Sequence, residues 1–419
     1  MSPKFPESQI SMLTLQNGLK LAYQPTPTST INARFRVNFG GLHEKPGEEG
    51  IAHFLEHFLV TGGTEEYSPE EQDAIRESFG HFNATTNAIE TVFQGDFVQD
   101  QLHEWLSFVK QTVFHPSFNA QRMEEERQRV LREMADRRSN PFYGIHREFL
   151  NRIMGHTAHQ RNYETLGESS VISTVTPENL IKFHQRGYFA GNSDLVIAGG
   201  IPDDLEETIT SLFSSEKAGE SQKIVLPRNP AVEHFVMHIP PPYSHDQKST
   251  VLEVHAQAPA KEELIAYSFG TAAAVLERKL FHNLSQRKGL CYGINIEYSS
   301  SRNFGLVSVK TNVVPERLEE ALDAIFSEMQ NLRRGDFTQE EVQTIKHSAV
   351  YHTAKSLETN GGHVHELLSY IKYGRTRNEH LKSIDGVTWS GVLDAMQIFP
   401  SSRQDKNYAL YIVDPLKRE

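Results

Sequence analysis

The sequence Ile51-Ala52-His53-Phe54-Leu55-Glu56-His57-Phe58-Leu59 places two histidines four residues apart, with a glutamate directly before the second. On a helix, residues at i and i+4 lie on one face with Cβ atoms about 5–6 Å apart, so both imidazoles can reach one metal ion. Glu56 follows His53 by three residues and therefore leans toward the same side. The alternative is that two histidines merely form the polar stripe of an amphipathic helix, because the motif specifies only three positions. We interpret the H-x-x-E-H pattern as a metal site.

The apolar residues of this stretch predict a helix that is buried along the rest of its surface. The segment 46–50 supplies a suitable start, and Gly62-Gly63 supplies a suitable end. The residues expected to face the protein core are Ile51, Phe54, Leu55, Phe58 and Leu59.

Length and composition indicate an ordinary globular chain with two or more cores. The chain has 419 residues, of which 38% are hydrophobic and 23% are charged. Its 42 Lys+Arg against 54 Asp+Glu give a formal charge of −12, which disfavours nucleic acid and anionic membranes as main partners. The acidic balance either favours cationic substrates mildly or simply keeps the protein in solution.

The cysteine count and the lengths of the apolar runs exclude two further classes of protein, those with intrachain disulfides and those that span a membrane. The single cysteine, Cys291, excludes an intrachain disulfide, and its default role is that of a small buried apolar residue. No apolar run approaches the length of a membrane span. The N-terminal residues lack the features of a signal or transit peptide, so we expect a cytoplasmic protein, with a processed organellar form as the alternative.

The pattern along residues 1–215 predicts a mixed α and β domain. Strands are predicted over 31–39, 82–86, 91–97 and 195–200, and in a hairpin over 12–23 that turns at Asn17-Gly18. The strict alternation over 31–39 predicts a half-buried strand. Helices are predicted over 69–78, 102–113, 119–138, 144–154 and 177–185.

No helix or strand pattern is evident over 214–230, a segment rich in Ser, Glu, Lys and Gly. This composition favours a linker over 216–230. We therefore expect a first domain over 1–215 and a second over 231–419. In the second, strands are predicted over 251–256, 292–298 and 305–311, and helices over 262–284 and from Pro315 and Thr338.

Local likeness between the two halves suggests a duplication. Phe118-Asn119 resembles Phe337-Thr338, which lies 219 residues later, and Ile145-His146 falls opposite Val364-His365 at the same offset. A period this long implies two copies of one α+β domain rather than a solenoid.

A catalytic zinc site usually takes three protein ligands and leaves the fourth position to water. The charged helix over 119–138 offers four glutamates as a third ligand: Glu124, Glu125, Glu126 and Glu133. The alternative is that all of them lie on a solvated face among Glu–Arg pairs.

Helical spacing discriminates among these glutamates. Glu126 and Glu133 share one stripe with Met123 and Val130, whose apolar side chains suggest that the stripe faces inward. Carboxylates on a buried stripe are costly unless they are paired or bind a metal. Glu126 and Glu133 therefore stand out, although spacing alone leaves the choice between them open.

The chain as a whole resembles pitrilysin/insulinase-type zinc peptidases, in the short class that includes mitochondrial processing peptidase and its bacterial relatives. The resemblance is strongest over 50–57 and also includes 15–19 and 82–86. Residues 188–199 and 289–292 fit the family more loosely. The family implies two homologous halves, each an antiparallel sheet with helices packed on one side.

The resemblance also implies a complete metal site with one Zn²⁺ per chain. The third ligand of the family is a glutamate some 75 residues beyond the second histidine, which is Glu133, and the glutamate seven residues earlier, Glu126, supports the site from outside the ligand shell. With His53 and His57 as the other ligands, Glu56 is the catalytic base that activates a water molecule.

The family further implies how a peptide binds. An extended substrate adds as a further strand to the edge strand that contains Asn83, Ala84 and Thr85. The sequence alone is equally consistent with an internal strand at this position. By the same resemblance, Tyr292 of the second half lies near the substrate carbonyl.

The second half contains no H-x-x-E-H. Its histidines His352, His363 and His365, with Glu366 beside them, lack metal-ligand spacing and are interpreted as surface or structural residues. Two positions depart from the family: Ser285 stands where an arginine is usual, and Val60 where many relatives have phenylalanine. Arg287 or Lys288 is a possible but displaced substitute for that arginine.

We therefore expect a zinc endopeptidase that cuts short or unfolded peptides in a chamber formed by two subunits. The partner is either a paralogue that lacks the zinc motif, which Ser285 slightly favours, or a second copy of this chain. The alternative is a non-catalytic structural or assembly subunit on the same fold. A purely structural zinc site is disfavoured because a closed site requires a fourth protein ligand.

Overall fold

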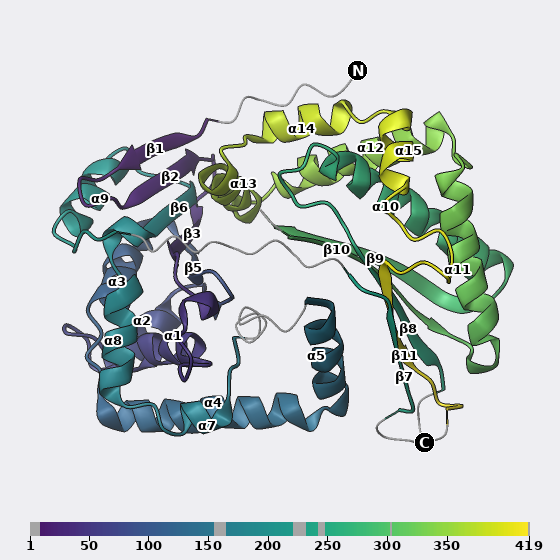
Figure 1. The fold of residues 1–419 in the computed structure, drawn as a ribbon. Coiled ribbons are helices and arrows are strands. Elements are labelled where there is room, and N and C mark those ends of the chain that lie inside the picture. Colours follow the sequence, from purple (N-terminus) through teal and green to yellow (C-terminus); the bar gives the residue numbers. More distant parts are fainter. Residues whose placement is uncertain (1–8, 155–164, 221–231, 242–247, 302–303, 418–419) are drawn as a thin grey trace.

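The computed structural model of the chain describes residues 9–154, 165–220, 232–241, 248–301 and 304–417, and these form two halves, each a sheet with helices packed on it (Figure 1). The first half contains a six-stranded sheet in the order β1-β2-β6-β3-β5-β4. Its strands are β1 (Ser11–Thr14), β2 (Lys20–Pro25), β3 (Thr30–Val37), β4 (His81–Thr86), β5 (Thr91–Val98) and β6 (Ser193–Gly199). Its helices are α1 (Ile51–Thr61), α2 (Pro69–Ser78), α3 (Leu102–Phe114), α4 (Ala120–Ser139), α5 (Pro141–Met154), α7 (Ser169–Ile172), α8 (Pro177–Gly187) and α9 (Leu205–Phe213).

The second half contains a five-stranded sheet in the order β7-β11-β8-β10-β9. Its strands are β7 (Phe235–Ile239), β8 (Thr250–Gln257), β9 (Cys291–Ser301), β10 (Phe304–Val313) and β11 (Tyr408–Val413). Its helices are α10 (Ala266–Leu280), α11 (Leu318–Arg333), α12 (Gln339–Ser356), α13 (Asn360–Tyr373), α14 (Arg377–Asp385) and α15 (Trp389–Met396). A π-helical segment, Phe281–Arg287, continues α10.

The two sheets share one topology, which supports the predicted duplication. Strands β2, β3, β4, β5 and β6 follow the same order in sequence and in space as β7, β8, β9, β10 and β11. Helices α5 and α13 have the same length, and both bounds of α13 lie 219 positions after those of α5, which is the predicted offset.

The sheets are mostly antiparallel, as the family resemblance implies, but each includes one parallel pair. These pairs are β2–β6 in the first half and β7–β11 in the second. Parallel neighbours need a long crossover connection, and here most of each half lies between the two paired strands.

One helix from each half packs on the sheet of the other half. Each sheet is therefore covered by helices on both sides, whereas helices on one side of each sheet were expected. Helix α5 packs on the second sheet, where Phe149 and Ile153 join Phe235 and Tyr411 in one buried cluster. Helix α13 packs on the first sheet, where a second cluster contains Val364, Leu367, Ala22, Val196 and Ala198. Figure 1 shows α5 beside the second sheet and α13 beside the first.

This exchange explains why β3 is buried on both faces rather than half-buried. One face of β3 contributes to the core of the first half, and α13 lies over the other. Polar contacts fix α13 there: Lys372 forms an ion pair with Glu90 at 3.0 Å, and the Asn360 amide donates a hydrogen bond to the Thr30 carbonyl at 2.9 Å.

The described part of the predicted linker, residues 216–220, lies against the first half. The Asn17 amide donates to the Glu216 carbonyl at 3.0 Å, and Ala190 N–H donates to the Lys217 carbonyl at 3.0 Å. The remainder of that prediction, 221–230, lies outside the described residues. Within the described ranges no helix has both the length and the apolar character needed to cross a membrane.

We predict that Phe149→Ala destabilises the second half, although Phe149 belongs to the first. Its buried ring lies 5.2 Å from the Tyr411 ring and 5.0 Å from the His255 ring, between centroids. Loss of a buried phenylalanine side chain costs about 3–5 kcal/mol. Urea unfolding followed by Trp389 fluorescence in a Trp105→Phe background, where Trp389 is the sole tryptophan, measures this loss.

The matched control is Tyr351→Ala on α12, because the Tyr351 side chain is 62% exposed. An unchanged Trp389 transition in Phe149→Ala would show that α5 does not support the second sheet.

Candidate functional site

Helix α1 begins where only glycine fits. Gly50 has φ +98°, and a Cβ at this position would lie 2.9 Å from the Gly167 Cα. The first turn has no side-chain cap of its own, and the buried Glu44 carboxylate accepts the N–H groups of Gly50 and Ala52 at 3.0 and 2.9 Å. Burial raises the pKa of Glu44 to about 8, although these two backbone hydrogen bonds oppose the rise. The start of α1, and with it the position of the histidines, is therefore fixed from outside the helix.

The buried face of α1 is the predicted one. Ile51, Phe54, Leu55, Phe58 and Leu59 are all buried in the core of the first half. His53 and His57 lie on the opposite side and remain partly accessible. The two imidazole rings have centroids 4.7 Å apart and meet edge to face.

Helix α4 packs against α1 and presents two carboxylates to the histidines. Its N-cap is Asn119, whose side chain accepts the Arg122 N–H at 3.0 Å. Met123, Glu126 and Val130 are buried along one stripe. By contrast, Glu124 and Glu125 face solvent in ion pairs with Arg127 and Arg122, at 2.7 and 3.0 Å.

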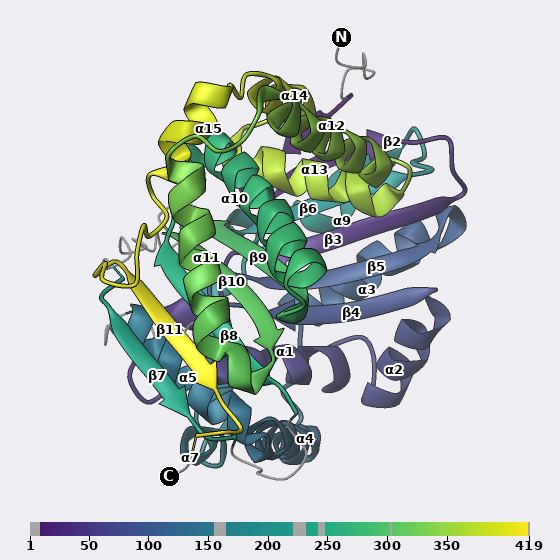
Figure 2. The ribbon, with the colours of Figure 1, turned by 90° about the vertical axis from the view of Figure 1, so that its right-hand side faces the viewer.

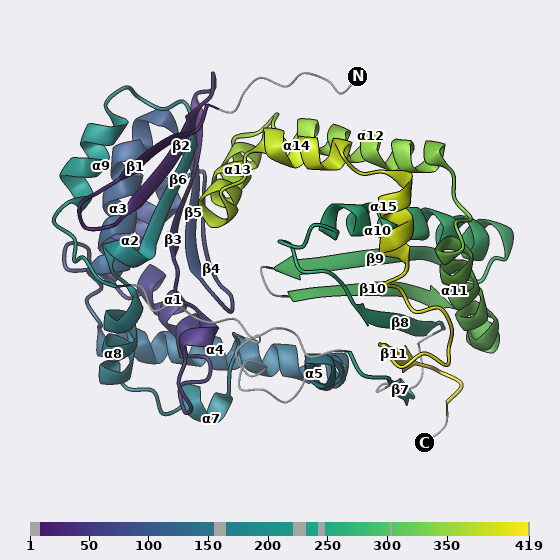
Figure 3. The same ribbon diagram turned by 45° about the horizontal axis from the view of Figure 1, so that its top comes forward.

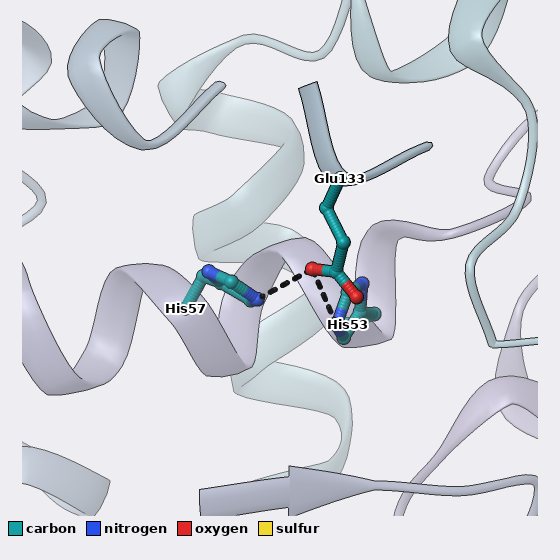
Figure 4. A group of neighbouring side chains, drawn as sticks. All are labelled: His53, His57 and Glu133. Atoms are coloured by element: carbon teal, nitrogen blue, oxygen red, sulfur yellow. Dashed lines mark ion pairs between the residues drawn. The ribbon is translucent and has the colours of Figure 1, made fainter. Parts of the chain in front are cut away.

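The donor atoms of three residues converge between α1 and α4 (Figure 4). The Glu133 Oε2 lies 3.8 Å from the His53 Nε2 and 3.5 Å from the His57 Nε2. All the donor atoms of this group lie within 4.8 Å of one another. Two donors about 2.0–2.1 Å from one tetrahedral Zn²⁺ lie about 3.3–3.4 Å apart, so a small contraction brings this group to ligand geometry.

Glu126 lies behind the ligand group, beside the other nitrogen of His57. Its Oε2 is 3.6 Å from the His57 Nδ1. A proton held on Nδ1 by this carboxylate leaves the Nε2 lone pair directed toward Glu133, where a metal would accept it. The donor set of His53, His57 and Glu133 therefore fits zinc. Glu126 lies beside the His57 Nδ1 instead, so its candidate role is to orient that imidazole and not to bind the metal.

The environment controls the protonation of all three residues of the motif. Burial lowers the pKa of His53 to about 3, with further contributions from His57 and Arg137, so this imidazole is neutral and able to bind a metal. Burial also acts to lower the pKa of His57, but the carboxylates of Glu126, Glu56 and Glu133 outweigh it and raise the pKa above the usual value. Burial raises the pKa of Glu56, although His57 and hydrogen bonds with Thr86 oppose the rise.

Glu56 and the three candidate ligands line a cavity of about 600 Å³. Asn83, Ala84 and Thr85 line the same cavity from β4, which is the edge strand of the first sheet (Figure 2). The sequence had left open whether this strand was internal. Val60 is also part of the wall.

Tyr292 does not line this cavity. It lies on β9 of the second sheet, and its side chain is 98% exposed. The Ser285 hydroxyl donates to the Tyr292 carbonyl at 3.1 Å, and Arg287 points toward the Asn283 side chain at 3.5 Å. The role of Tyr292 in substrate binding stays a prediction.

Three arginines that were not predicted from the sequence line the cavity. Arg129 forms an ion pair with Glu126 at 3.0 Å, and Arg137 forms one with Glu133 at 2.9 Å. Their i+3 and i+4 spacing from the two glutamates was a usable signal. Arg76 comes from α2 and donates to the Val60 carbonyl at 3.1 Å, which no local spacing indicates.

Comparison with known proteins places these observations in one family. Residues 20–163 match the family model described as Insulinase (Peptidase family M16), and residues 174–349 match the one described as Peptidase M16 inactive domain. An uncharacterized zinc protease from Rickettsia felis is 24% identical over 315 residues, which are 73% of this chain and 74% of that protein. The uncharacterized zinc protease YmxG from Bacillus subtilis is 21% identical over 417 residues, which are 97% of this chain and 98% of that protein.

Solved structures share the fold at low sequence identity. A protease from Helicobacter pylori superposes with a TM-score of 0.82 at 20% identity and covers 97% of this chain and 100% of its own. The first half of the periplasmic protease PqqL from Escherichia coli gives 0.82 at 17% identity and covers 98% of this chain and 93% of its own.

We predict that Glu126→Gln lowers zinc affinity at pH 8 by about 10- to 100-fold, because the carboxylate that orients a ligating histidine is lost. Protons compete with zinc for His57, so affinity falls as the pH falls through the pKa of His57. Glu126 raises that pKa, so its removal moves the fall to lower pH. Competition with a coloured chelator between pH 5.5 and 8 measures both effects.

Glu124→Gln, on the exposed face of the same helix, is the matched control and leaves the profile unchanged. A Glu126→Gln profile that coincides with that of the unmodified protein would contradict this role for Glu126.

Proposed function

Because this chain belongs to the insulinase family of peptidases, M16, we propose that it is a zinc-dependent endopeptidase that cleaves short or unfolded peptides. The observation that carries the proposal is the convergence of His53, His57 and Glu133 on one point, with Glu56 in the same cavity. Each of these residues alone has common structural roles. Their convergence beside an exposed sheet edge is what a metallopeptidase requires.

In this proposal His53, His57 and Glu133 hold the zinc. When bound, zinc supplies Lewis acidity that activates a water molecule and polarises the scissile carbonyl. Among the described residues the group contains three ligands, and a three-residue site leaves one coordination position for chemistry. Glu126 keeps the His57 imidazole oriented through Nδ1.

Glu56 is the proposed proton carrier. It belongs to α1 like the two histidines, but it is not part of the ligand group. A general base works best when its pKa is near the working pH, and burial moves the pKa of Glu56 in that direction. Its carboxylate takes a proton from the water and returns it to the amine that leaves.

The proposed substrate binds as an added strand on β4. This strand pairs with β5 on one side only, and its residues Asn83, Ala84 and Thr85 line the cavity. Recognition through the backbone requires an extended peptide and makes little demand on its sequence. Short or unfolded peptides satisfy this requirement, whereas folded chains do not.

We further propose that the active form contains two subunits. The partner is either a paralogue that lacks the zinc motif or a second copy of this chain. Ser285, in the position where the family resemblance implies an arginine, favours a paralogue that supplies the cation. The mass of the native complex by light scattering, with identification of its chains, separates the two forms.

One observation favours a second candidate, a non-catalytic structural subunit. The expected arginine is absent at Ser285, and Tyr292 lies outside the cavity. The retained His53, His57, Glu133 and Glu56 weigh against it, because a structural subunit has no need of them.

We predict that Glu56→Gln binds zinc with an affinity within a few-fold of the unmodified protein and cleaves an unstructured, internally quenched peptide at least 100-fold more slowly. The amide keeps the size of the side chain but cannot accept the proton, and general-base catalysis contributes about 10²–10⁴-fold. Metal content and peptide fluorescence are measured on the same samples, with and without a chelator.

Glu66→Gln, an exposed glutamate substituted in the same way, is the control. Normal turnover by Glu56→Gln would sink the assignment of the base. No turnover by the zinc-loaded unmodified complex would favour the structural subunit.

We also predict that backbone changes in the peptide matter more than side-chain changes. N-methylation at alternate residues near the cleaved bond removes the donors that pair with β4 and lowers kcat/KM by at least tenfold. A peptide of the same composition in scrambled order is cleaved within a few-fold of the parent. Equal cleavage of the methylated and parent peptides would rule out recognition by strand addition.

A further inference from the structure

The second half contains a cavity of its own, of about 920 Å³, between α10, α12, α13, α14 and the edge strand β9. Figure 3 shows α12, α13 and α14 together on one side of the molecule, with α10 and β9 beneath them. None of its lining residues belongs to the zinc-site cavity of the first half.

The duplication relates the two cavities position by position. Helix α4 lines the first cavity with Glu126, Arg129, Glu133 and Arg137. The residues of α12 that lie 219 positions later all line the second, and they are Ile345, Ser348, His352 and Ser356. Both cavities also border the edge strand of their sheet, β4 in one half and β9 in the other.

The second cavity lacks the residues of the candidate metal site and is larger than the first, at about 920 Å³ against about 600 Å³. Ile345 and His352 stand in the positions of Glu126 and Glu133. Helix α10 presents Gly270 and Ala274, two small residues with the i, i+4 spacing of the histidines on α1. A Cβ on Gly270 would meet only the Tyr298 ring, at 3.9 Å, so this wall is open.

Lys261, Arg278 and Arg375 are three cations that line the cavity without an ion pair to any of the described residues, and the exposed Arg278 lies on α10, apart from the loops that carry the other two. Neither Lys261 nor Arg375 forms an ion pair with a carboxylate of the described residues, and the Lys261 Nζ lies over the Tyr373 ring at 4.1 Å. Lys261 and Arg375 line the same cavity, and burial, with the charges of Lys372 and Arg375, lowers the pKa of Lys261. An anion placed between them would relieve this repulsion.

The carboxylates that line this cavity form no ion pair with Lys261 or Arg375. Outside the lining, Glu379 has a pKa that is lowered by its hydrogen bonds with Thr376 and further by the charges of Lys382 and Arg375, so it is the acidic group nearest to Arg375 in effect. Glu366 pairs with Arg377 at 3.3 Å, and Glu277 accepts the Ile296 N–H at 3.2 Å. Glu262 is exposed at the surface. Elsewhere the wall is largely apolar, with Phe281, Ile294, Ile345, Leu357 and Ile384 among its side chains.

We propose that this cavity binds the carboxylate end of an extended peptide whose last side chains are apolar. The terminal carboxylate pairs with Arg375 and Lys261, the apolar side chains fill the wall opposite, and the backbone adds to β9 as it does to β4 at the zinc site. A volume of this size accommodates several residues. The inference rests on the proposed function, because it takes the ligand to be a substrate or product of the peptidase.

The test measures binding separately from cleavage. A decapeptide that ends in Leu-Phe, with fluorescein at its amino end, is titrated with the zinc-loaded Glu56→Gln protein, and fluorescence polarisation is recorded. The peptide is made with a free carboxylate and as the carboxamide. The free acid is expected to bind about 10- to 100-fold more tightly, because a charged hydrogen bond is lost in the amide.

Substitutions in the cavity assign this difference to named residues. Arg375→Ala removes the preference for the free acid and Arg375→Lys retains most of it, while Gly270→Leu fills the cavity and weakens both peptides. The matched controls are Arg334→Ala, an exposed arginine, and Gly144→Leu, a helical glycine with open space around it. Thermal midpoints establish that every variant is folded.

Equal affinity for acid and amide, or a preference that survives in Arg375→Ala, overturns the inference. Tighter binding of decanoate than of the peptide also overturns it, because the occupant is then a fatty acid. Cleavage by the unmodified protein without acid preference refutes this inference alone. Acid preference without cleavage by the unmodified protein refutes the peptidase and leaves the peptide-end site standing.

Discussion

The packing of α4 across α1 is the contact on which the rest of the site depends. Helix α1 supplies both histidines and the proposed base, Glu56, but two imidazoles do not hold a metal in a hydrolytic site without a third ligand. The candidate third ligand, Glu133, lies on a helix whose own buried stripe, Met123, Glu126 and Val130, packs against α1. The same stripe places Glu126 beside the His57 Nδ1. The contact between α1 and α4 therefore positions both Glu133, the proposed third ligand, and Glu126, the group proposed to orient His57.

The far end of α4 is held by the other half of the molecule. Helix α5 follows α4 directly and is buried against the second sheet through Phe149 and Ile153. The duplicated pair α12 and α13 makes the reverse connection to the first sheet. Each half thus anchors the helix that directly follows a helix lining the other half's cavity, α5 after α4 and α13 after α12. Displacement of one sheet relative to the other would act on Glu133 through this connection.

The sequence predicted those parts of the site that depend on local spacing. The buried arc of α1 and the separation of Glu126 and Glu133 from Glu124 and Glu125 both follow from helical periodicity within one element. The distinct roles of Glu126 and Glu133 did not, because they depend on the direction in which α4 crosses α1. The burial of β3 on both faces was missed for the same reason, since the covering helix α13 lies more than 300 residues away in sequence. Strand β11, a continuous apolar run at 408–413, was within reach of periodicity and was not predicted.

The two halves use one topology for different chemistry. Replacement of Glu126 and Glu133 by Ile345 and His352 on the equivalent helix removes the carboxylates that a metal requires, while the edge strand remains beside the cavity. The central claim is that His53, His57 and Glu133 are the ligands of a three-residue zinc site. X-ray absorption at the zinc edge of the metal-loaded protein tests it most directly. The account predicts two imidazole nitrogens and one or two oxygens at about 2.0–2.1 Å, with one protein oxygen lost in Glu133→Ala. A sulfur ligand from Cys291, a third imidazole, or an unchanged spectrum in Glu133→Ala would contradict it.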